Sequence, residues 1–294
     1  MKVLVVGGTG MLGHKMFQVL QRRISDTWCT VREASNSCAL RRIDLFHGGN
    51  VLWNVDVADF CALQQLLIEK RPEVVVNCVG IIKQRATANS AIPNIEINAL
   101  LPHKLQQWCQ DWNGRLIHFS TDCVFSGKRG NYSEEDLSDA EDIYGKSKFL
   151  GEVTAGRALT LRTSIIGREL SEFKSLLEWF LQQDHKNIMG YTQAYYSGVT
   201  TNYLTELVAR IIQEQPKLSG LYQVTGDTIS KYNLLCLLRD AFAMEVKIQP
   251  DDSFFCDRSM RGDKFVNATG YRTPAWPELA GELGKDRTPY EEWR

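Results

Sequence analysis

The sequence lacks a strong net charge and a long apolar run, and each absence excludes a class of protein. A formal net charge of -1 over 294 residues gives no bulk electrostatic reason to bind nucleic acid or an anionic membrane. No uninterrupted apolar stretch approaches the roughly 18 to 20 residues that span a bilayer. The apolar run Val3–Val6 is too short for a signal-peptide core. We therefore expect a cytoplasmic protein without a nucleic-acid or membrane partner.

Paired-cysteine motifs are also missing. The eight cysteines are scattered and never form a CxxC pair, a spacing on which many zinc sites depend. Several lie in apolar runs, where cysteine behaves as a small hydrophobic residue, so we interpret them as reduced thiols. Hydrophobic residues make up 44% and charged residues 23% of the chain, which is ordinary for folded proteins and indicates neither disorder nor a fibre. We expect a folded protein of enzyme size without a metal.

Short apolar runs alternate with longer helix-like segments over the first 167 residues. The predicted strands are residues 2–6, 27–31, 73–79, 115–120 and 158–164, and the predicted helices are 11–22, 60–70, 93–111 and 143–155. Continuous apolar strands are typical of burial on both faces, and their alternation with helices predicts an α/β protein with a doubly wound parallel sheet.

The rhythm changes after about residue 167. Further helices are predicted at residues 173–183, 202–214 and 230–243, around a stretch rich in glycine, tyrosine and threonine. We predict a cofactor-binding domain over residues 1–167, to which residues 198–225 return. Residues 168–197 and 226–294 then form a smaller C-terminal lobe for the substrate.

A glycine-rich turn follows the first predicted strand. The sequence GGTGMLG at residues 7–13 places Gly7, Gly10 and Gly13 directly before a helix. Such a turn lets backbone N–H groups and the helix N-terminus approach a pyrophosphate. A plain strand-to-helix turn is the alternative, but the strand before it and the helix after it favour a dinucleotide site. Met11 and Leu12 belong to the same predicted cofactor-binding turn.

The residues some twenty positions after the glycines bear on the choice of cofactor. Arg32 is followed by Glu33. An arginine here suits the 2′-phosphate of NADP(H), whereas an acid suits the ribose of NAD(H). We therefore expect NADP(H), with NAD(H) as the second choice. A solvated Arg-Glu pair is the simpler alternative.

A tyrosine and a lysine four residues apart open the helix predicted after the strand at 115–120. Tyr144 and Lys148 share one face of that helix, and Thr121 stands at the end of the strand, where ligands of parallel sheets bind. Ketone reduction needs hydride at carbon and a proton at oxygen, and a nearby ammonium lowers the pKa of a phenol. These three are the candidate catalytic residues. An exposed helix pair and a strand-end cap are the alternative.

Seven motifs together carry a family resemblance. They are GGTGMLG (7–13), NVDV (54–57), NCVG (77–80), INALLP (97–102), FSTDCVFSG (119–127), YGKSKFLGE (144–152) and LRTSIIG (161–167). Through them the chain resembles the extended short-chain dehydrogenase/reductase family, and within it the dTDP-4-dehydrorhamnose reductase type. The resemblance implies a Rossmann fold and a nucleotide-sugar substrate. A homodimer stays open.

The resemblance also implies roles for individual residues. Asp56 and Val57 would flank the adenine, while Cys78, Val79 and Gly80 would lie along the cofactor. Asn98 would be the structural asparagine of the central helix and, with Tyr144 and Lys148, would border the cofactor. Asp56 could instead cap the helix that starts near Asp59, and Asn98 could be an ordinary helix residue.

The segment STDCVFSG separates neighbouring activities within the family. The related 4,6-dehydratases usually carry a glutamate after the aspartate, where this chain has Cys123, so a base for carbon deprotonation is missing. The related epimerases usually have serine or alanine in place of Asp122. The pattern therefore resembles that of a reductase, with Thr121 catalytic and Asp122 in support. Thr121, Asp122 and Cys123 are also expected beside the substrate.

Two segments depart from the family pattern: residues 81–85, and residues 198–201, which read GVTT where the family usually has glycine, serine, proline and threonine. Lys83, Gln84 and Arg85 stand where the reductases usually have an alanine-rich segment with a tyrosine, and they could bind the sugar or be solvated. Arg258 and Arg261 are candidates for the nucleotide diphosphate, with a solvated loop as the alternative.

We expect an NAD(P)H-dependent reductase of the 4-keto group of a nucleotide-activated deoxysugar, serving polysaccharide biosynthesis. The alternatives are an epimerase or dehydratase of the same family, and a non-catalytic cofactor-binding regulatory subunit.

Overall fold

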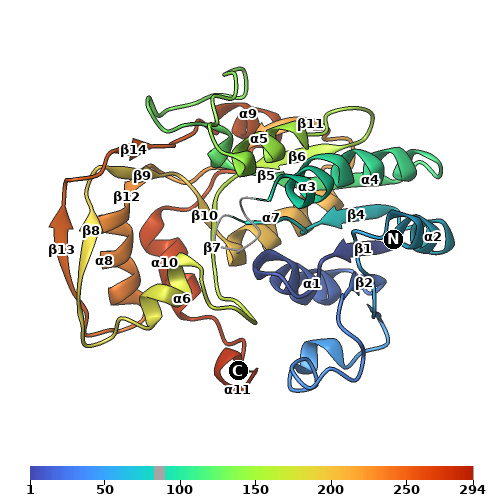
Figure 1. Ribbon diagram of the computed structural model, residues 1–294, viewed down its shortest axis with the longest axis horizontal. Coiled ribbons are helices and arrows are strands. Elements are labelled where there is room, and N and C mark those ends of the chain that lie inside the picture. The colour runs from blue at the N-terminus through green and yellow to red at the C-terminus, as the bar shows by residue number, and fades with distance from the viewer. Residues whose placement is uncertain (83–89, 294) are drawn as a thin grey trace.

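A parallel sheet forms the centre of the computed structural model, which describes residues 1–82 and 90–293 (Figure 1). Its seven strands within this range run in the order β11-β6-β5-β4-β1-β2-β3. They are β1 (Val3–Val6), β2 (Thr27–Thr30), β3 (Val51–Leu52), β4 (Val74–Asn77), β5 (Arg115–Ser120), β6 (Leu159–Arg162) and β11 (Gly220–Gln223). Every neighbouring pair is parallel. The predicted doubly wound α/β fold is confirmed.

Two hydrophobic cores lie on opposite faces of this sheet, because successive side chains of a strand point to opposite sides. On β1, Val3 and Val5 join the core beneath α1 (Met11–Arg23) and α7 (Thr201–Glu214). Leu4 and Val6 join the core beneath α2 (Phe60–Lys70) and α4 (Leu101–Gln110). Burial on both faces explains why the strands read as continuous apolar runs.

Two of the helices predicted within the first 167 residues differ from the structure. The segment predicted as one helix over 93–111 consists of α3 (Ala91–Asn94), the π-helix η3 (Ile95–Leu100) and α4. The helix predicted over 143–155 is α5, which spans only Ile143–Leu150. It stops at Gly151, where a Cβ would overlap the carbonyl oxygen of Asn98 on η3. Close packing of α5 on η3 therefore requires glycine at this position, and no local pattern predicts that.

A second group of elements lies to one side of the sheet (Figure 1). Its helices are α6 (Leu176–Leu181), α8 (Lys231–Ala241) and α10 (Trp276–Gly284), and its strands are β8 (Asn187–Tyr191), β9 (Ala194–Tyr196), β12 (Ile229–Ser230), β13 (Lys247–Asp251) and β14 (Cys256–Asp257). The paired strands β7 (Ile165–Ile166) and β10 (Val199–Thr200) lie between this group and the sheet. Two C-terminal helices pack on the sheet side instead: α9 (Asp263–Thr269) against β11, and α11 (Tyr290–Trp293) in the core beneath α1. A third hydrophobic core holds α6, α8 and α10 together. The predicted division of the chain into two domains stays a prediction.

The helix predicted over 173–183 is shorter in the structure, where α6 begins after Ser175. Glu172 and Phe173 have positive φ angles of 66° and 49°, which a right-handed helix excludes.

Among the described residues, no helix combines the length and the apolar character needed to cross a membrane.

Candidate active site

The glycine loop, residues 7–13, joins β1 to α1, and two of its glycines are required by the chain itself. Gly7 has a φ of +90°, and a Cβ there would lie 2.6 Å from Cγ2 of Val79. A Cβ on Gly13 would overlap the Gly7 carbonyl oxygen. The loop can therefore fold against the start of α1 only without side chains at these two positions.

Gly10 differs from the other two glycines because the protein leaves room for a side chain there. Its φ is -71°, and the nearest atom to a Cβ would be the Gly7 carbonyl oxygen at 3.7 Å. Gly10 is the N-cap of α1 and makes no side-chain capping bond, so backbone N–H groups of the first turn, which includes Met11 and Leu12, stay available. Open space over a helix N-terminus fits a pyrophosphate at close range.

The end of β2 lies against the glycine loop. The N–H groups of Gly7 and Gly8 donate to Oγ1 and the carbonyl of Thr30, at 3.0 and 2.8 Å. Two residues on, Arg32 is exposed and makes no hydrogen bond or ion pair to the described residues. The oxygen Oε2 of Glu33 is buried and has no hydrogen-bond partner among the described residues. Within the described residues, a cation and a carboxylate oxygen therefore lie without partners close to the glycine loop, the position at which an adenosine ribose is expected.

The predicted adenine residues follow β3 and run beside the end of β2. The N–H of Val55 donates to the carbonyl of Val31 at 3.0 Å. Asp56 is exposed, and its carboxylate accepts from the N–H of Ala58 at 3.0 Å. Asp59, and not Asp56, is the N-cap of α2. The position of Asp56 and Val57 thus agrees with a cofactor edge, and the capping alternative for Asp56 is excluded.

Residues after β4 connect the glycine loop to η3 and α5. Cys78 donates its N–H to the carbonyl of Val6 at 3.0 Å, and the Val79 side chain covers Gly7. A Cβ on Gly80 would lie 3.4 Å from Oδ1 of Asn98 and 3.9 Å from Nζ of Lys148. The structure therefore brings these predicted cofactor residues into one continuous edge.

Asn98 fixes the backbone of this edge from inside η3. Its side chain is fully buried, accepts from the N–H of Ile81 at 2.9 Å, and donates to the carbonyl of the same residue at 3.1 Å. It also donates to Oδ1 of Asn94 and Oγ of Ser147. π-Helical turns are frequent at functional sites, and this one aims an amide at the loop after β4. An ordinary helix residue would not make these bonds.

Thr121, Tyr144 and Asp122 meet at the carboxyl end of β5. The Thr121 hydroxyl donates to Oδ1 of Asp122 at 3.1 Å and accepts from the N–H of Cys123 at 3.2 Å. Burial raises the pKa of Tyr144 above its ordinary value, and the phenol is hydrogen-bonded to Thr121. Because the threonine proton is directed to Asp122, the phenol is the donor to Thr121. A chain of donors therefore runs from Tyr144 to Asp122.

Lys148 lies one helical turn beyond Tyr144 and points toward the sheet. Its ammonium donates to the carbonyl of Phe119 on β5 at 2.6 Å. Burial lowers the pKa of Lys148 to about 8, while the Glu152 carboxylate acts to raise it. Glu152 is itself held by Arg162 at 2.7 Å and by the hydroxyl of Ser120 at 2.6 Å. The pKa of Lys148 therefore lies close to neutral pH, and its ammonium lies between Gly80 and β5.

The start of α5 is seated on the turn that carries Thr121. Asp142 caps the helix by accepting from the N–H of Gly145 at 2.7 Å. A Cβ on Gly145 would overlap the Cys123 carbonyl oxygen. Glycine at this position allows the close approach that brings Tyr144 to Thr121, so the pair is not an exposed helix face.

A cavity of about 390 Å³ opens beside this turn. Arg258 borders it and donates to the carbonyls of Phe125 and Ser126 at 2.8 and 3.3 Å. Cys123 and Asp142 are among its other lining residues. Arg261 does not line the cavity. It is exposed and forms an ion pair with Asp263 at 2.9 Å. The predicted substrate residues Lys83 and Gln84 lie outside the described residues, as does Arg85.

The sequence did not predict a contact between Lys231 and Tyr196 at the same end of the site. Lys231 begins α8 and places Nζ 3.9 Å from the centroid of the Tyr196 ring on β9. Burial lowers the pKa of Lys231, and the Asp122 carboxylate acts to raise it. The two elements meet only in the folded chain, so no short motif marks this cation.

Comparisons with known proteins agree with this architecture. The family model described as RmlD substrate binding domain matches residues 1–259. The chain is 24% identical over 255 residues to methionine adenosyltransferase 2 subunit beta of Bos taurus, covering 82% of this chain and 72% of that protein. It is 29% identical over 150 residues to dTDP-4-dehydrorhamnose reductase of Streptomyces griseus, covering 51% and 43%.

A solved structure extends the likeness to the whole fold. It is the dTDP-4-dehydrorhamnose reductase from Bacillus anthracis str. Ames in complex with NADP. Its TM-score is 0.77 at 19% identity, covering 96% of this chain and 98% of that one. At this identity the match shows a common fold, and function has to be argued from the site.

Proposed function

Because the chain belongs to the RmlD substrate binding domain family, we propose that it reduces the 4-keto group of a nucleotide-activated deoxysugar with NADPH. The resemblance expected from the motifs is confirmed at the level of the family. One observation carries the proposal: the Tyr144 phenol is hydrogen-bonded to Thr121, with the Lys148 ammonium one turn away on the same helix.

The site provides a cradle that fits a dinucleotide. Gly10 lacks a side chain where the protein itself has room for one. Gly80 then leads from the glycine loop toward Lys148. Residues 7–13 and 78–80 would hold the cofactor, together with Arg32, Asp56, Val57 and Asn98. A reduced nicotinamide, when bound, supplies hydride to the keto carbon.

The protein residues handle the proton and the orientation of the substrate. Tyr144 donates its proton to the keto oxygen, and the Lys148 charge stabilises the phenolate that is left. The Thr121 hydroxyl, which donates to Asp122, would rotate to donate its proton to the same oxygen. Arg258, Cys123 and Asp122 would lie along the substrate, with the guanidinium directed to its diphosphate. Lys83 and Gln84 remain proposed sugar contacts on the basis of the sequence alone.

An NADPH-oxidation assay over a panel of nucleotide 4-ketosugars tests the proposal. We expect NADPH consumption that depends on the ketosugar, with one product configuration at C4 by NMR. An epimerase or dehydratase would convert substrate without consuming NADPH. Activity on simple ketones and on no nucleotide sugar would contradict the proposed substrate.

A non-catalytic subunit is a second candidate, favoured by the match over 82% of this chain to methionine adenosyltransferase 2 subunit beta. Such a protein would bind NADPH and leave it unoxidised with every ketosugar. The assembled Tyr144, Thr121 and Lys148 favour the reductase, because a subunit has no need of a proton donor.

Arg32→Ala is expected to weaken NADPH binding by about 10- to 100-fold, the loss of one charge-assisted contact to phosphate. NADH binding should change less than twofold, because NADH lacks the 2′-phosphate. Isothermal titration of both cofactors measures the ratio. If the wild type prefers NADH and Glu33→Gln removes that preference, the unpartnered Glu33 oxygen, and not Arg32, selects the cofactor.

Activity is expected to fall as the pH rises through about 8, the pKa of Lys148. Below that pH the side chain is charged, and above it the lysine is neutral and no longer stabilises a phenolate. A pH profile of kcat/KM measures this limb. In Lys148→Arg the cation persists, so the limb should move to higher pH even if the rate is lower. An unchanged limb in that variant would assign the titration to another group.

A further inference from the structure

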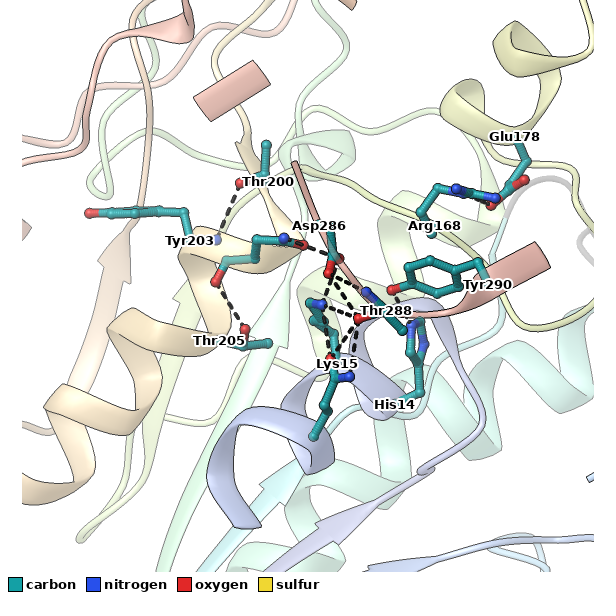
Figure 2. A network of polar contacts seen from close by, with 12 residues as sticks. His14, Lys15, Arg168, Glu178, Thr200, Tyr203, Thr205, Asp286, Thr288 and Tyr290 are labelled. Atoms are coloured by element: carbon teal, nitrogen blue, oxygen red, sulfur yellow. Dashed lines mark hydrogen bonds and ion pairs between the residues drawn. The ribbon is translucent and has the colours of Figure 1, made fainter. Parts of the chain in front are cut away.

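The segment 286–293 folds back onto α1, the helix that follows the glycine loop (Figure 2). Lys15 of α1 forms an ion pair with Asp286 at 2.6 Å, and the two side chains are only 6% and 10% exposed. Thr288 accepts from Lys15 at 2.9 Å and from Gln18 at 3.0 Å. A buried, charge-paired contact of this kind holds the segment in one place.

His14 links this segment to the glycine loop. Its side chain is 1% exposed, and its Nδ1 lies 2.9 Å from the carbonyl oxygen of Gly10. Its Nε2 lies 2.9 Å from the hydroxyl of Tyr290. Burial lowers the pKa of His14 to about 4, so the ring is neutral at physiological pH. A carbonyl can only accept, so Nδ1 carries the proton and Nε2 accepts from Tyr290.

Tyr290 is itself rigidly held. It is 4% exposed, and its ring meets His14 edge-on with centroids 5.6 Å apart. The Arg168 guanidinium lies 4.8 Å from the centre of the Tyr290 ring and forms ion pairs with Glu178 and Glu291. Figure 2 shows Tyr290 between His14 and this arginine. The phenol is thus fixed from both sides.

We propose that Tyr290 and His14 are positioning residues for the dinucleotide, acting through the Gly10 carbonyl. Gly10 is the N-cap of α1, so the orientation of its peptide sets the direction of the N–H groups that face a pyrophosphate. The inference rests on the proposed dinucleotide site. Tyr290 lies beyond residues 1–259, which match the family model, whereas Gly10 and His14 lie within them.

Tyr290→Phe tests the relay, because it removes one hydroxyl and keeps the ring beside Arg168. We expect the Kd and the KM for NADPH to rise about five- to tenfold, the worth of one lost hydrogen bond. The kcat at saturating NADPH and the KM for the ketosugar should change less than twofold. A general loss of structure would instead lower kcat and weaken both ligands together.

Tyr271→Phe is the matched control. Its hydroxyl donates to Glu214 at 2.5 Å, at the far end of α7 from the glycine loop. The same deletion there should leave the Kd for NADPH unchanged at a comparable thermal midpoint. Wild-type affinity in Tyr290→Phe would overturn the relay alone. A wild-type protein that binds neither NADPH nor NADH would overturn the proposed function and the relay together.

Discussion

Tyr144→Phe is expected to lower kcat for ketosugar reduction by about 100- to 10,000-fold, the usual worth of a positioned proton donor. The ring still fills the space beside Thr121, so the fold and the Kd for NADPH should be retained. Stopped-flow measurement of NADPH oxidation with the best ketosugar gives the rate, and fluorescence titration gives the Kd. Tyr271→Phe serves again as the control, because its hydroxyl lies outside the site.

The loss has a specific physical origin. In the wild type the Tyr144 proton is already directed into a hydrogen bond with Thr121, so little reorganisation is needed to pass it to an oxygen bound there. A Tyr144→Phe protein with full activity would mean that another group delivers the proton. A Tyr144→Phe protein with full biological effect and no turnover in the wild type would favour the subunit.

Gly13→Ala is expected to abolish useful cofactor affinity, with a loss on the order of 100-fold or more. The new methyl group would overlap the Gly7 carbonyl oxygen, so the backbone of the loop must move away from α1. Overpacking of this kind also costs about 3 kcal/mol of stability. Thermal unfolding and NADPH titration measure the two effects, and wild-type values for both would contradict the described loop geometry.

Two further substitutions separate loop packing from ligand contact. Gly281 lies in α10 with open space at its Cβ position, so Gly281→Ala should stabilise the protein by about 0.5–1 kcal/mol and leave affinity unchanged. Gly10→Ala should keep wild-type stability, because no protein atom comes closer than 3.7 Å to the added methyl group. Its affinity for NADPH should nevertheless fall. Equal affinity in Gly10→Ala would mean that no ligand approaches there.

The parts of the fold that could be predicted are those with a local signal. Five strands of the sheet, β1, β2, β4, β5 and β6, have apolar runs that predict them, and the glycine loop is marked by its position between β1 and α1. The strands β3 and β11 were not predicted. Tyr144 and Lys148 were identifiable because one helix carries both. The placement of Tyr144 beside Thr121 needed only the rule that ligands of parallel sheets bind at the carboxyl ends of the strands.

What escaped prediction depends on contacts between distant segments. Gly151, where α5 ends earlier than predicted, packs directly against the backbone of Asn98, and neither residue signals the other in the sequence. Lys231 joins the site through the packing of α8 against β9. The sequence of η3 has ordinary helical periodicity, so it does not predict a π-helix. The role of this turn is seen only from the hydrogen bonds of Asn98 to the backbone of Ile81.

The link between His14 and Tyr290 spans 276 positions of the sequence, and this separation has a kinetic consequence. Contacts between remote positions form late, because chain closure must precede them. During refolding, the parallel sheet can acquire its circular dichroism signal before the last turn reaches α1. Recovery of tight NADPH binding should therefore lag behind recovery of secondary structure, so that the nucleotide cradle is among the last parts of the molecule to mature.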